Sequence, residues 1–288
     1  MTDDPFVSHR SLLFTVAYEM LGSAADAEDV LHEAWLRWAD VDQSQVSDPR
    51  AYLIRVVTRQ ALNQMRTLSR RREEYVGEWL PEPLLTSPDV AEDVELAESV
   101  SMAMLTVLET LEPTERAVFV LREVFDMPYG EIAEAMGKSA AAVRQMGWRA
   151  RQHVAARRPR VQVSRSEQQA VVERFLSAVR TGQIRDMMDI LAPDVVLTAD
   201  GGGLVPAARV PVHGAEPVAT LLARANRVQA GFSTRIVWLN GAPAGHIQVG
   251  GQSIAVSLVV ENGQVSRIYA VANPRKLTRL DQPAELAR

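Results

Sequence analysis

The sequence predicts a multidomain chain with two all-helical domains, the second of which carries a helix-turn-helix, followed by an α+β domain. Three observations predict this order. Apolar residues recur at helical spacing through the first half of the chain, a glycine turn precedes a capped helix near residue 139, and β-rich runs with Asn-Gly turns fill the last part. A length of 288 residues suits two or three small domains.

The first helical domain is expected at residues 1–72. Ser23 can cap a helix that has acidic residues in its opening turn, where the positive end of the helix dipole favours them. Pro49 suits the first turn of a following helix that runs to Arg72. The apolar face of the Ser23-capped helix is expected to consist of Ala27, Val30, Leu31, Ala34, Trp35 and Trp38.

Residues 73–98 are expected to form an acidic linker. The segment holds nine acids and no base, and prolines between residues 81 and 88 disfavour a helix. It contains one apolar cluster, Trp79-Leu80-Pro81-Glu82-Pro83. Because an exposed tryptophan in a solvated tether is unfavourable, we expect this cluster to dock on another part of the chain.

The second helical domain is expected at residues 99–160. It ends in three helical segments, from near Pro113 to Val124, from Tyr129 to Met136 and from Ser139 to Arg151. Gly137 stands where a tight turn is needed, and Ser139 can cap the last helix. This spacing predicts a helix-turn-helix.

The α+β domain is expected at residues 166–277, followed by a tail at 278–288. Two helical stretches, 167–180 and 184–191, come first. They lead through 194–203 into β-rich runs with Asn-Gly turns at 240–241 and 262–263. Helices followed by such runs predict an α+β domain with an antiparallel sheet.

Composition and charge restrict the class of protein. Cysteine is absent, which excludes disulfides and thiolate metal sites. The N-terminus does not resemble a signal peptide, and no apolar run approaches the ~20 residues that span a bilayer, so we expect a soluble cytoplasmic protein without a membrane partner. The net charge is −5, yet residues 55–72 carry six arginines and residues 138–165 eight Lys/Arg, both without an acid. Two such blocks indicate two phosphate-contacting elements.

Three segments resemble extracytoplasmic-function RNA polymerase sigma factors. DAEDVLHEAWLRWA at 26–39 resembles their region 2.2, AYLIRVVTRQALNQMR at 51–66 their next helix, and residues 111–151 their region 4. In addition, WLPEP in the linker, DGGG at 200–203 and NPRKL at 273–277 resemble the subgroup with a SnoaL-like C-terminal extension. The chain departs from the family at Arg275, where NPDKL has an acid, at His32, often Gln, and at Asn63, often Asp.

The resemblance implies a sigma factor that directs core RNA polymerase to promoters, with no catalytic residue, metal or cofactor. It implies that one face of the region 2.2 helix binds the β′ clamp helices of core polymerase, with the β flap as a further contact; the central residues would be Asp29, His32 and Glu33. The −10 element would be held, with its strands melted, by Arg50, Arg55, Arg59, Asn63 and Arg66. The −35 element would be contacted by Lys138, Ser139, Ala141, Arg144, Gln145, Arg149 and Arg151.

The roles within the −35 set follow from side-chain chemistry. Arg144 can pair with guanine and Gln145 with adenine, whereas Lys138, Arg149 and Arg151 suit phosphates.

The resemblance implies an NTF2-like C-terminal fold, a curved sheet wrapped by helices around a pocket. Catalytic relatives use carboxylate or His bases, for which this chain offers Asp194, Asp200, His213, His246 and Tyr269, but no acid–base pair is readable. We expect regulation instead, through a contact of the linker with the C-terminal motifs, made by Trp79, Leu80, Pro81, Asp200, Gly201, Asn273, Pro274 and Lys276. A small ligand in the pocket stays open.

Two alternatives also stay open. One is a helix-turn-helix regulator with a ligand-binding domain, which would need no polymerase-binding helix. The other is an NTF2-like enzyme with a DNA-binding appendage.

Overall fold

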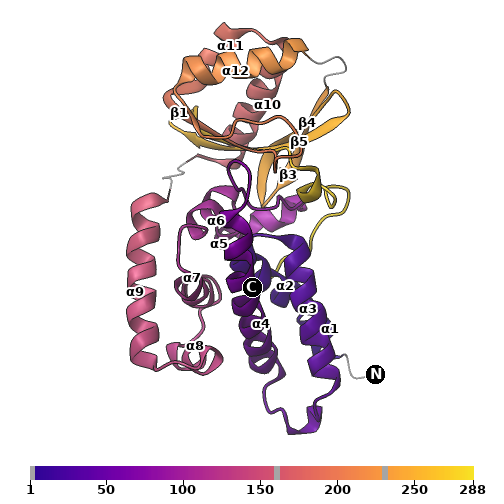
Figure 1. Ribbon diagram of the computed structural model, residues 1–288, viewed down its shortest axis with the longest axis vertical. Coiled ribbons are helices and arrows are strands. Elements are labelled where there is room, and N and C mark those ends of the chain that lie inside the picture. Colours follow the sequence, from indigo (N-terminus) through magenta and orange to yellow (C-terminus); the bar gives the residue numbers. More distant parts are fainter. Residues whose placement is uncertain (1–3, 159–162, 229–232) are drawn as a thin grey trace.

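The computed structural model describes residues 4–158, 163–228 and 233–288 (Figure 1). The first helical domain comprises α1 (Pro5–Ser8), α2 (Arg10–Leu21), α3 (Ala24–Ala39), a short 3₁₀ turn (Gln43–Gln45) and α4 (Pro49–Glu73). As predicted, Ser23 caps α3, its Oγ accepting from the Asp26 amide at 3.2 Å. The core between α2, α3 and α4 buries the expected apolar positions with one exception. Trp35 is 44% exposed, because it lies at the edge of the stripe rather than at its centre.

The linker leads through a 3₁₀ turn (Pro88–Glu92) into the second helical domain, made of α5 (Val94–Ser99), α6 (Met102–Leu108), α7 (Pro113–Phe119), a π turn (Val120–Val124), α8 (Tyr129–Met136) and α9 (Ala140–Arg157). Gly137 joins α8 to α9 with a φ of +64°, a conformation that glycine adopts without strain. Ser139 caps α9 by accepting from the Ala142 amide. The predicted helix-turn-helix is therefore confirmed.

The C-terminal domain combines α10 (Arg165–Thr181), α11 (Ile184–Met188) and α12 (Ala215–Val228) with a sheet of order β2-β1-β6-β5-β4-β3. The strands are β1 (Leu191–Asp200), β2 (Val212–His213), β3 (Ser233–Leu239), β4 (Ala242–Val249), β5 (Gln252–Glu261) and β6 (Gln264–Val271). The predicted α+β class is confirmed, and both Asn-Gly pairs form hairpin turns with positive φ.

The expectation of a wholly antiparallel sheet is wrong, because β1 pairs with β6 in parallel. Three elements of this domain also escaped prediction, namely the short strand β2, strand β4 and helix α12. Strand β4 begins with Ala-Pro-Ala-Gly, which has low strand propensity, and is held by its two neighbours. Helix α12 follows a glycine-rich segment and has a proline at its start.

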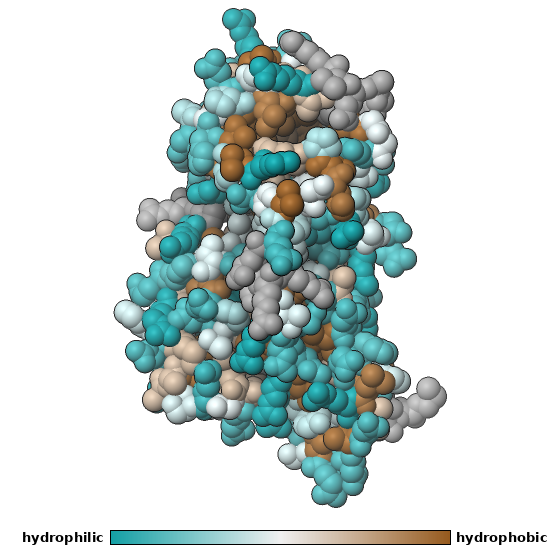
Figure 2. Space-filling view, viewed as in Figure 1, coloured by the Kyte–Doolittle hydropathy of each residue, from teal (hydrophilic) through white to brown (hydrophobic). Residues whose placement is uncertain are grey.

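The two faces of the sheet have different coverings. Helices α10, α11 and α12 pack on one face, and the other rests on the linker and α6 (Figure 1). That second face forms a separate apolar cluster that includes Leu80, Met102, Leu239, Val259 and Tyr269. On the side seen in Figure 2, hydrophilic residues predominate over the helical domains, and hydrophobic ones gather over the C-terminal domain.

The β3–β4 turn joins all three parts of the molecule. The side-chain amide of Asn240 donates to the Tyr18 hydroxyl at 2.7 Å and to the Val100 carbonyl at 2.9 Å, and its oxygen accepts from the Leu84 amide at 3.1 Å. Tyr18 lies on α2, Leu84 in the linker and Val100 after α5. The side chain of Asn240 therefore fixes the C-terminal domain against both helical domains and the linker.

The tail returns across the helical domains. The Ala284 amide donates to the Leu85 carbonyl at 2.8 Å, and the Ala287 amide to the Thr15 hydroxyl at 3.1 Å. Arg288 pairs with Asp93 and Glu95 at the start of α5. No helix among the described residues is both long and apolar enough to cross a bilayer.

Candidate functional site

The polar face of α3 is open to solvent. Asp29, His32 and Glu33 are all exposed. Beside them, Trp35 and Leu36 are 44% and 41% exposed, and the rings of His32 and Trp35 stack with centroids 6.4 Å apart. Exposed apolar side chains next to charged ones suit a protein-binding surface. The sequence pattern assigned Trp35 to the core and so missed it here.

Helix α4 presents a stripe of arginines that the second helical domain partly covers. Arg59 donates from Nε to the Ala135 carbonyl at 2.9 Å and from its guanidinium to the Glu134 carbonyl at 3.2 Å. Arg55 lies 3.5 Å from the Glu134 carboxylate. These carbonyls end α8, where the helix dipole is negative. Within the same set, Arg66 donates to the side-chain oxygen of Asn63 at 3.4 Å. The remaining members are all exposed, and they are Arg50, Asn63 and Arg66.

The exposed face of α9 carries most of the predicted base-reading residues. Ala141, Arg144 and Gln145 point away from the core, while Val143 and Met146 are buried. Lys138 and Ser139 are exposed at its N-terminal end.

Two arginines of α9 are engaged within the domain. Arg149 pairs with Glu115 at 2.7 Å, and Arg151 with Glu123 at 3.1 Å. Sequence reasoning missed Trp148, which is 58% exposed. Its spacing of three from Gln145 and four from Arg144 would have placed it on the same face.

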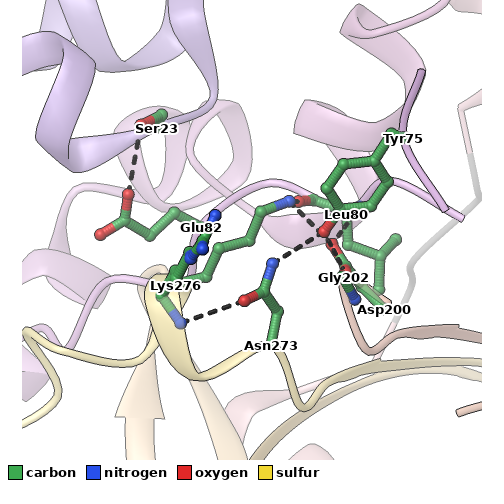
Figure 3. A network of polar contacts seen from close by, with 9 residues as sticks. Ser23, Tyr75, Leu80, Glu82, Asp200, Gly202, Asn273 and Lys276 are labelled. Atoms are coloured by element: carbon green, nitrogen blue, oxygen red, sulfur yellow. Dashed lines mark hydrogen bonds and ion pairs between the residues drawn. The ribbon is translucent and has the colours of Figure 1, made fainter. Parts of the chain in front are cut away.

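The linker is bound by a buried polar network, hereafter the clamp, centred on Asp200 at the end of β1 (Figure 3). The carboxylate of Asp200, which is 0% exposed, accepts from the Tyr75 hydroxyl at 2.5 Å, the Leu80 amide at 3.0 Å and the Gly202 amide at 3.0 Å. It also pairs with Lys276 Nζ at 2.7 Å. All these partners are donors, so the carboxylate is fully paired.

Lys276 and Asn273 complete the clamp from the other side. Lys276 Nζ donates to the Leu80 carbonyl at 2.5 Å and lies 3.2 Å from the centre of the Trp79 ring, an attractive cation–π geometry. Asn273 donates to the Tyr75 hydroxyl at 2.8 Å. Tyr75 was not predicted; burial and the neighbouring Asp200 carboxylate raise its pKa, so it stays a donor.

Among the other residues predicted here, Pro81 is buried and Pro274 is exposed. Gly201 is placed by close packing, since a Cβ there would lie 2.5 Å from the Val205 carbonyl oxygen. Arg275 is exposed, and only its backbone amide contacts Asn273. The departure from NPDKL at this position therefore leaves the clamp intact.

Glu82 ties the same linker to α3. Its carboxylate accepts from the Ala24 amide at 2.8 Å and from the Ser23 hydroxyl at 3.3 Å at the positive end of the helix dipole. Burial raises the pKa of this carboxyl. Glu82 lies within the cluster expected to dock, but its partners on α3 could not be predicted, because the contact depends on the path of the folded linker.

The candidates for acid–base chemistry do not assemble into a catalytic site. Asp194 and His213 are exposed, and Asp200 is committed to the clamp. His246 is buried in the sheet; its Nδ1 accepts from Arg235 at 2.8 Å, and burial with the nearby guanidinium lowers its pKa.

Comparison with known proteins identifies the two helical domains. Residues 6–71 match the model of Sigma-70 region 2, and residues 101–154 match that of Sigma-70, region 4. The chain is 36% identical to the ECF RNA polymerase sigma factor SigJ of Mycobacterium tuberculosis, over 95% of this chain and 92% of that protein. The chain belongs to the ECF RNA polymerase sigma factors.

Other relatives agree. A probable ECF RNA polymerase sigma factor, SigI of M. tuberculosis, is 31% identical over 95% of this chain and 93% of its own length. The crystal structure of M. tuberculosis SigJ superposes with a TM-score of 0.74, covering 95% of this chain and 97% of that one at 32% identity. The similarity therefore extends through the C-terminal domain.

Family membership decides between the functions left open by the sequence. A sigma factor is not an enzyme, and the family binds core RNA polymerase and promoter DNA. Neither the lone helix-turn-helix regulator nor the enzyme with a DNA-binding appendage accounts for the region 2 match. The C-terminal α+β domain, a curved mixed sheet with helices on one face, is the arrangement expected of NTF2-like folds (Figure 1).

Proposed function

We propose that this sigma factor is controlled by its C-terminal domain, which holds regions 2 and 4 in a closed arrangement by binding the linker between them. The observation that carries the proposal is the clamp. The buried Asp200 carboxylate and the buried Lys276 ammonium both bind the backbone of Leu80 in the linker, and Lys276 also lies over the Trp79 ring. A surface tether would need none of these contacts.

The closed arrangement is expected to be inactive. Arg59 would contact promoter phosphates near the −10 element. Here its guanidinium donates two hydrogen bonds to the carbonyls of Glu134 and Ala135 near the end of α8, and Arg55 faces the Glu134 carboxylate. Helix α8 belongs to the helix-turn-helix that would read the −35 element. Both promoter elements can be engaged only after these contacts separate.

The polymerase contact is proposed on α3. Asp29, His32 and Glu33 stay exposed in the closed arrangement, with Trp35 and Leu36 beside them as apolar anchors. Polymerase can therefore meet region 2 before the clamp opens. Binding energy on this face is then available to shift the equilibrium toward the open arrangement.

In region 4, α9 would enter the −35 major groove. Arg144 and Gln145 offer the donors that read guanine and adenine, and Trp148 adds an apolar surface suited to thymine methyl groups. Arg149 and Arg151, oriented by Glu115 and Glu123, are suited to phosphates.

Run-off transcription with core polymerase tests the regulatory role. Trp79→Ala should raise transcription and speed protease cleavage between residues 73 and 98, because the linker loses its largest anchor. Combined Asp200→Ala and Asn273→Ala should reproduce this phenotype, and adding Trp79→Ala to them should change little more, since all three break one contact. Glu74→Ala, an exposed change in the same linker, is the control.

The proposal is wrong if Trp79→Ala leaves both transcription and cleavage at the level of the wild type. The C-terminal domain would then be a passive tethered module.

A further inference from the structure

A hollow of about 300 Å³ lies between region 4 and the C-terminal domain, on the sheet face that Figure 1 shows above α5 and α6. One wall comes from α5 and α6 and includes Ala97, Met102 and Met104. The opposite wall comes from the sheet and includes Leu239, Val259 and Tyr269. This volume is at the small end of ligand pockets, and its mainly apolar lining is typical of them.

Tyr269 brings an unused polar group to this apolar floor. The residue is 6% exposed, and its hydroxyl makes no hydrogen bond within the part of the chain that the structure describes. Burial raises its pKa, so the hydroxyl remains a donor at neutral pH. The hydroxyl is therefore a donor with no protein partner among the described residues at the floor of the hollow, and a ligand oxygen can accept from it.

The rim of the hollow carries a surplus of positive charge. Among the described residues its charged members are Glu98, Arg158 and Arg165, of which Glu98 and Arg158 form an ion pair. Arg165 is exposed, makes no ion pair with any described residue, and starts α10, a helix of 17 residues. Gln168, one turn further on, lines the rim as well. A cationic side chain at the positive end of a helix dipole favours an anionic group.

We propose that this hollow binds a small amphipathic molecule, an apolar body bearing a carboxylate or another oxyanion. The apolar body would contact Met102, Met104 and Val259, an oxygen would accept from Tyr269, and the anionic group would face Arg165. The flexible methionines allow the wall to fit more than one shape.

The location of the site predicts whether the ligand raises or lowers transcription. This effect on transcription rests on the closed arrangement proposed above. Because the two walls belong to different domains, separating region 4 from the sheet divides the site. A ligand that needs both walls binds the closed arrangement more tightly, and so stabilises it and lowers transcription.

The site is tested by fluorescence titration of the full-length protein with 8-anilinonaphthalene-1-sulfonate, an amphipathic anion that emits strongly in apolar surroundings. Tyr269→Phe should weaken its binding about 3- to 10-fold, the usual effect of one lost hydrogen bond. The melting temperature of the free variant should not fall, since the hydroxyl has no described protein partner. Tyr52→Phe is the control, because the Tyr52 hydroxyl in region 2 has no described partner and lies far from the hollow. This variant should bind the probe like the wild type.

Arg165→Gln should also weaken binding, and this loss should shrink at high salt, where the wild type loses the same interaction. Ala103→Phe, which fills the hollow from α6, should abolish probe binding there. Equal affinities of the wild type, Tyr269→Phe and Ala103→Phe would overturn the site, because the probe would then bind elsewhere.

The predicted loss of transcription on ligand binding is measured separately, by adding the probe to run-off transcription. Inhibition of the wild type that is relieved by Tyr269→Phe supports it, and undiminished transcription at saturating probe overturns it. If Trp79→Ala without probe leaves transcription unchanged, the closed-state proposal fails while the titration still decides the site.

Discussion

Lys276→Met should release the linker, because it removes the counter-charge of a fully buried carboxylate. Asp200 keeps the Tyr75 hydroxyl and the Leu80 and Gly202 amides, but none of these carries a full charge. Removing one partner of a buried ion pair costs about 3–5 kcal/mol. Since 1.4 kcal/mol is a factor of ten, the open population should rise by about a hundred-fold to a few thousand-fold.

Hydrogen exchange measures this opening directly. The Leu80 amide is bonded to Asp200 and should exchange faster by the same factor, as should the Leu84 amide bonded to Asn240 if the linker leaves as one unit. Arg275→Met is the matched control, because this neighbouring cation is exposed, its side chain makes no described hydrogen bond or ion pair with the clamp, and its only influence there is a weak electrostatic one on Tyr75. It should leave both rates unchanged.

A second variant separates the ion pair from simple packing. Asp200→Asn together with Lys276→Met removes both charges at nearly constant volume, so it should cost much less than the sum of the two single changes. Additive costs would mean that the two charges do not interact. Wild-type exchange at Leu80 in Lys276→Met would refute the clamp as the anchor of the linker.

Three further outcomes are expected. Combined alanine substitution on the exposed face of α3 should abolish co-elution with core polymerase while the circular dichroism of the protein persists; the positions are Asp29, His32 and Glu33. Arg144→Ala should weaken promoter binding by about 1–3 kcal/mol and relax the preference for one −35 base. Arg149→Ala should instead weaken binding to all promoter sequences alike. DNA titrations with substituted promoters measure both effects. Burial raises the pKa of Glu19 to about 8 where region 2 meets Ser99 and Arg116. The contribution of Glu19 to the stability of the closed arrangement should therefore be full below pH ~4.3, the exposed value, and be lost as pH rises through 8. Glu19→Gln should abolish that pH dependence of linker exchange, and a persisting dependence would contradict the assignment.

The helical half of the fold was predictable because its signals are local. Ser23, Pro49, Gly137 and Ser139 each act within one turn of their own helix, and the helices begin and turn where these residues stand. Trp35 marks the limit of this reasoning. Helical periodicity places a residue on a face but does not say how far the neighbouring helices extend over it.

The C-terminal half depended more on tertiary contacts. The pairing of β1 with β6 is parallel and joins distant segments, so no turn signal announces it. The Asn-Gly pair at 240–241 predicted a hairpin correctly, but its second role, the contact of Asn240 with Tyr18 and Val100, arises only in the folded chain.

The clamp likewise combines contacts that the sequence predicted with contacts that it did not. Unusual residues in the linker and in DGGG and NPRKL pointed to Leu80, Asp200 and Lys276, which the structure brings into contact. Their regulatory role stays a prediction. The role of Tyr75 and the α3 partners of Glu82 could not be foreseen, because both contacts depend on the path of the folded linker.

The central claim, that the C-terminal domain holds regions 2 and 4 together, is tested most directly by measuring the distance between them. The chain has no cysteine, so Ala39→Cys on α3 and Ala156→Cys on α9, both exposed, provide two unique sites for spin labels. Pulsed electron paramagnetic resonance should give one narrow short-distance population for the otherwise unchanged protein. With Lys276→Met, or with core polymerase bound, a broad population at longer distance should replace it. The same narrow distribution in all three samples would contradict the account.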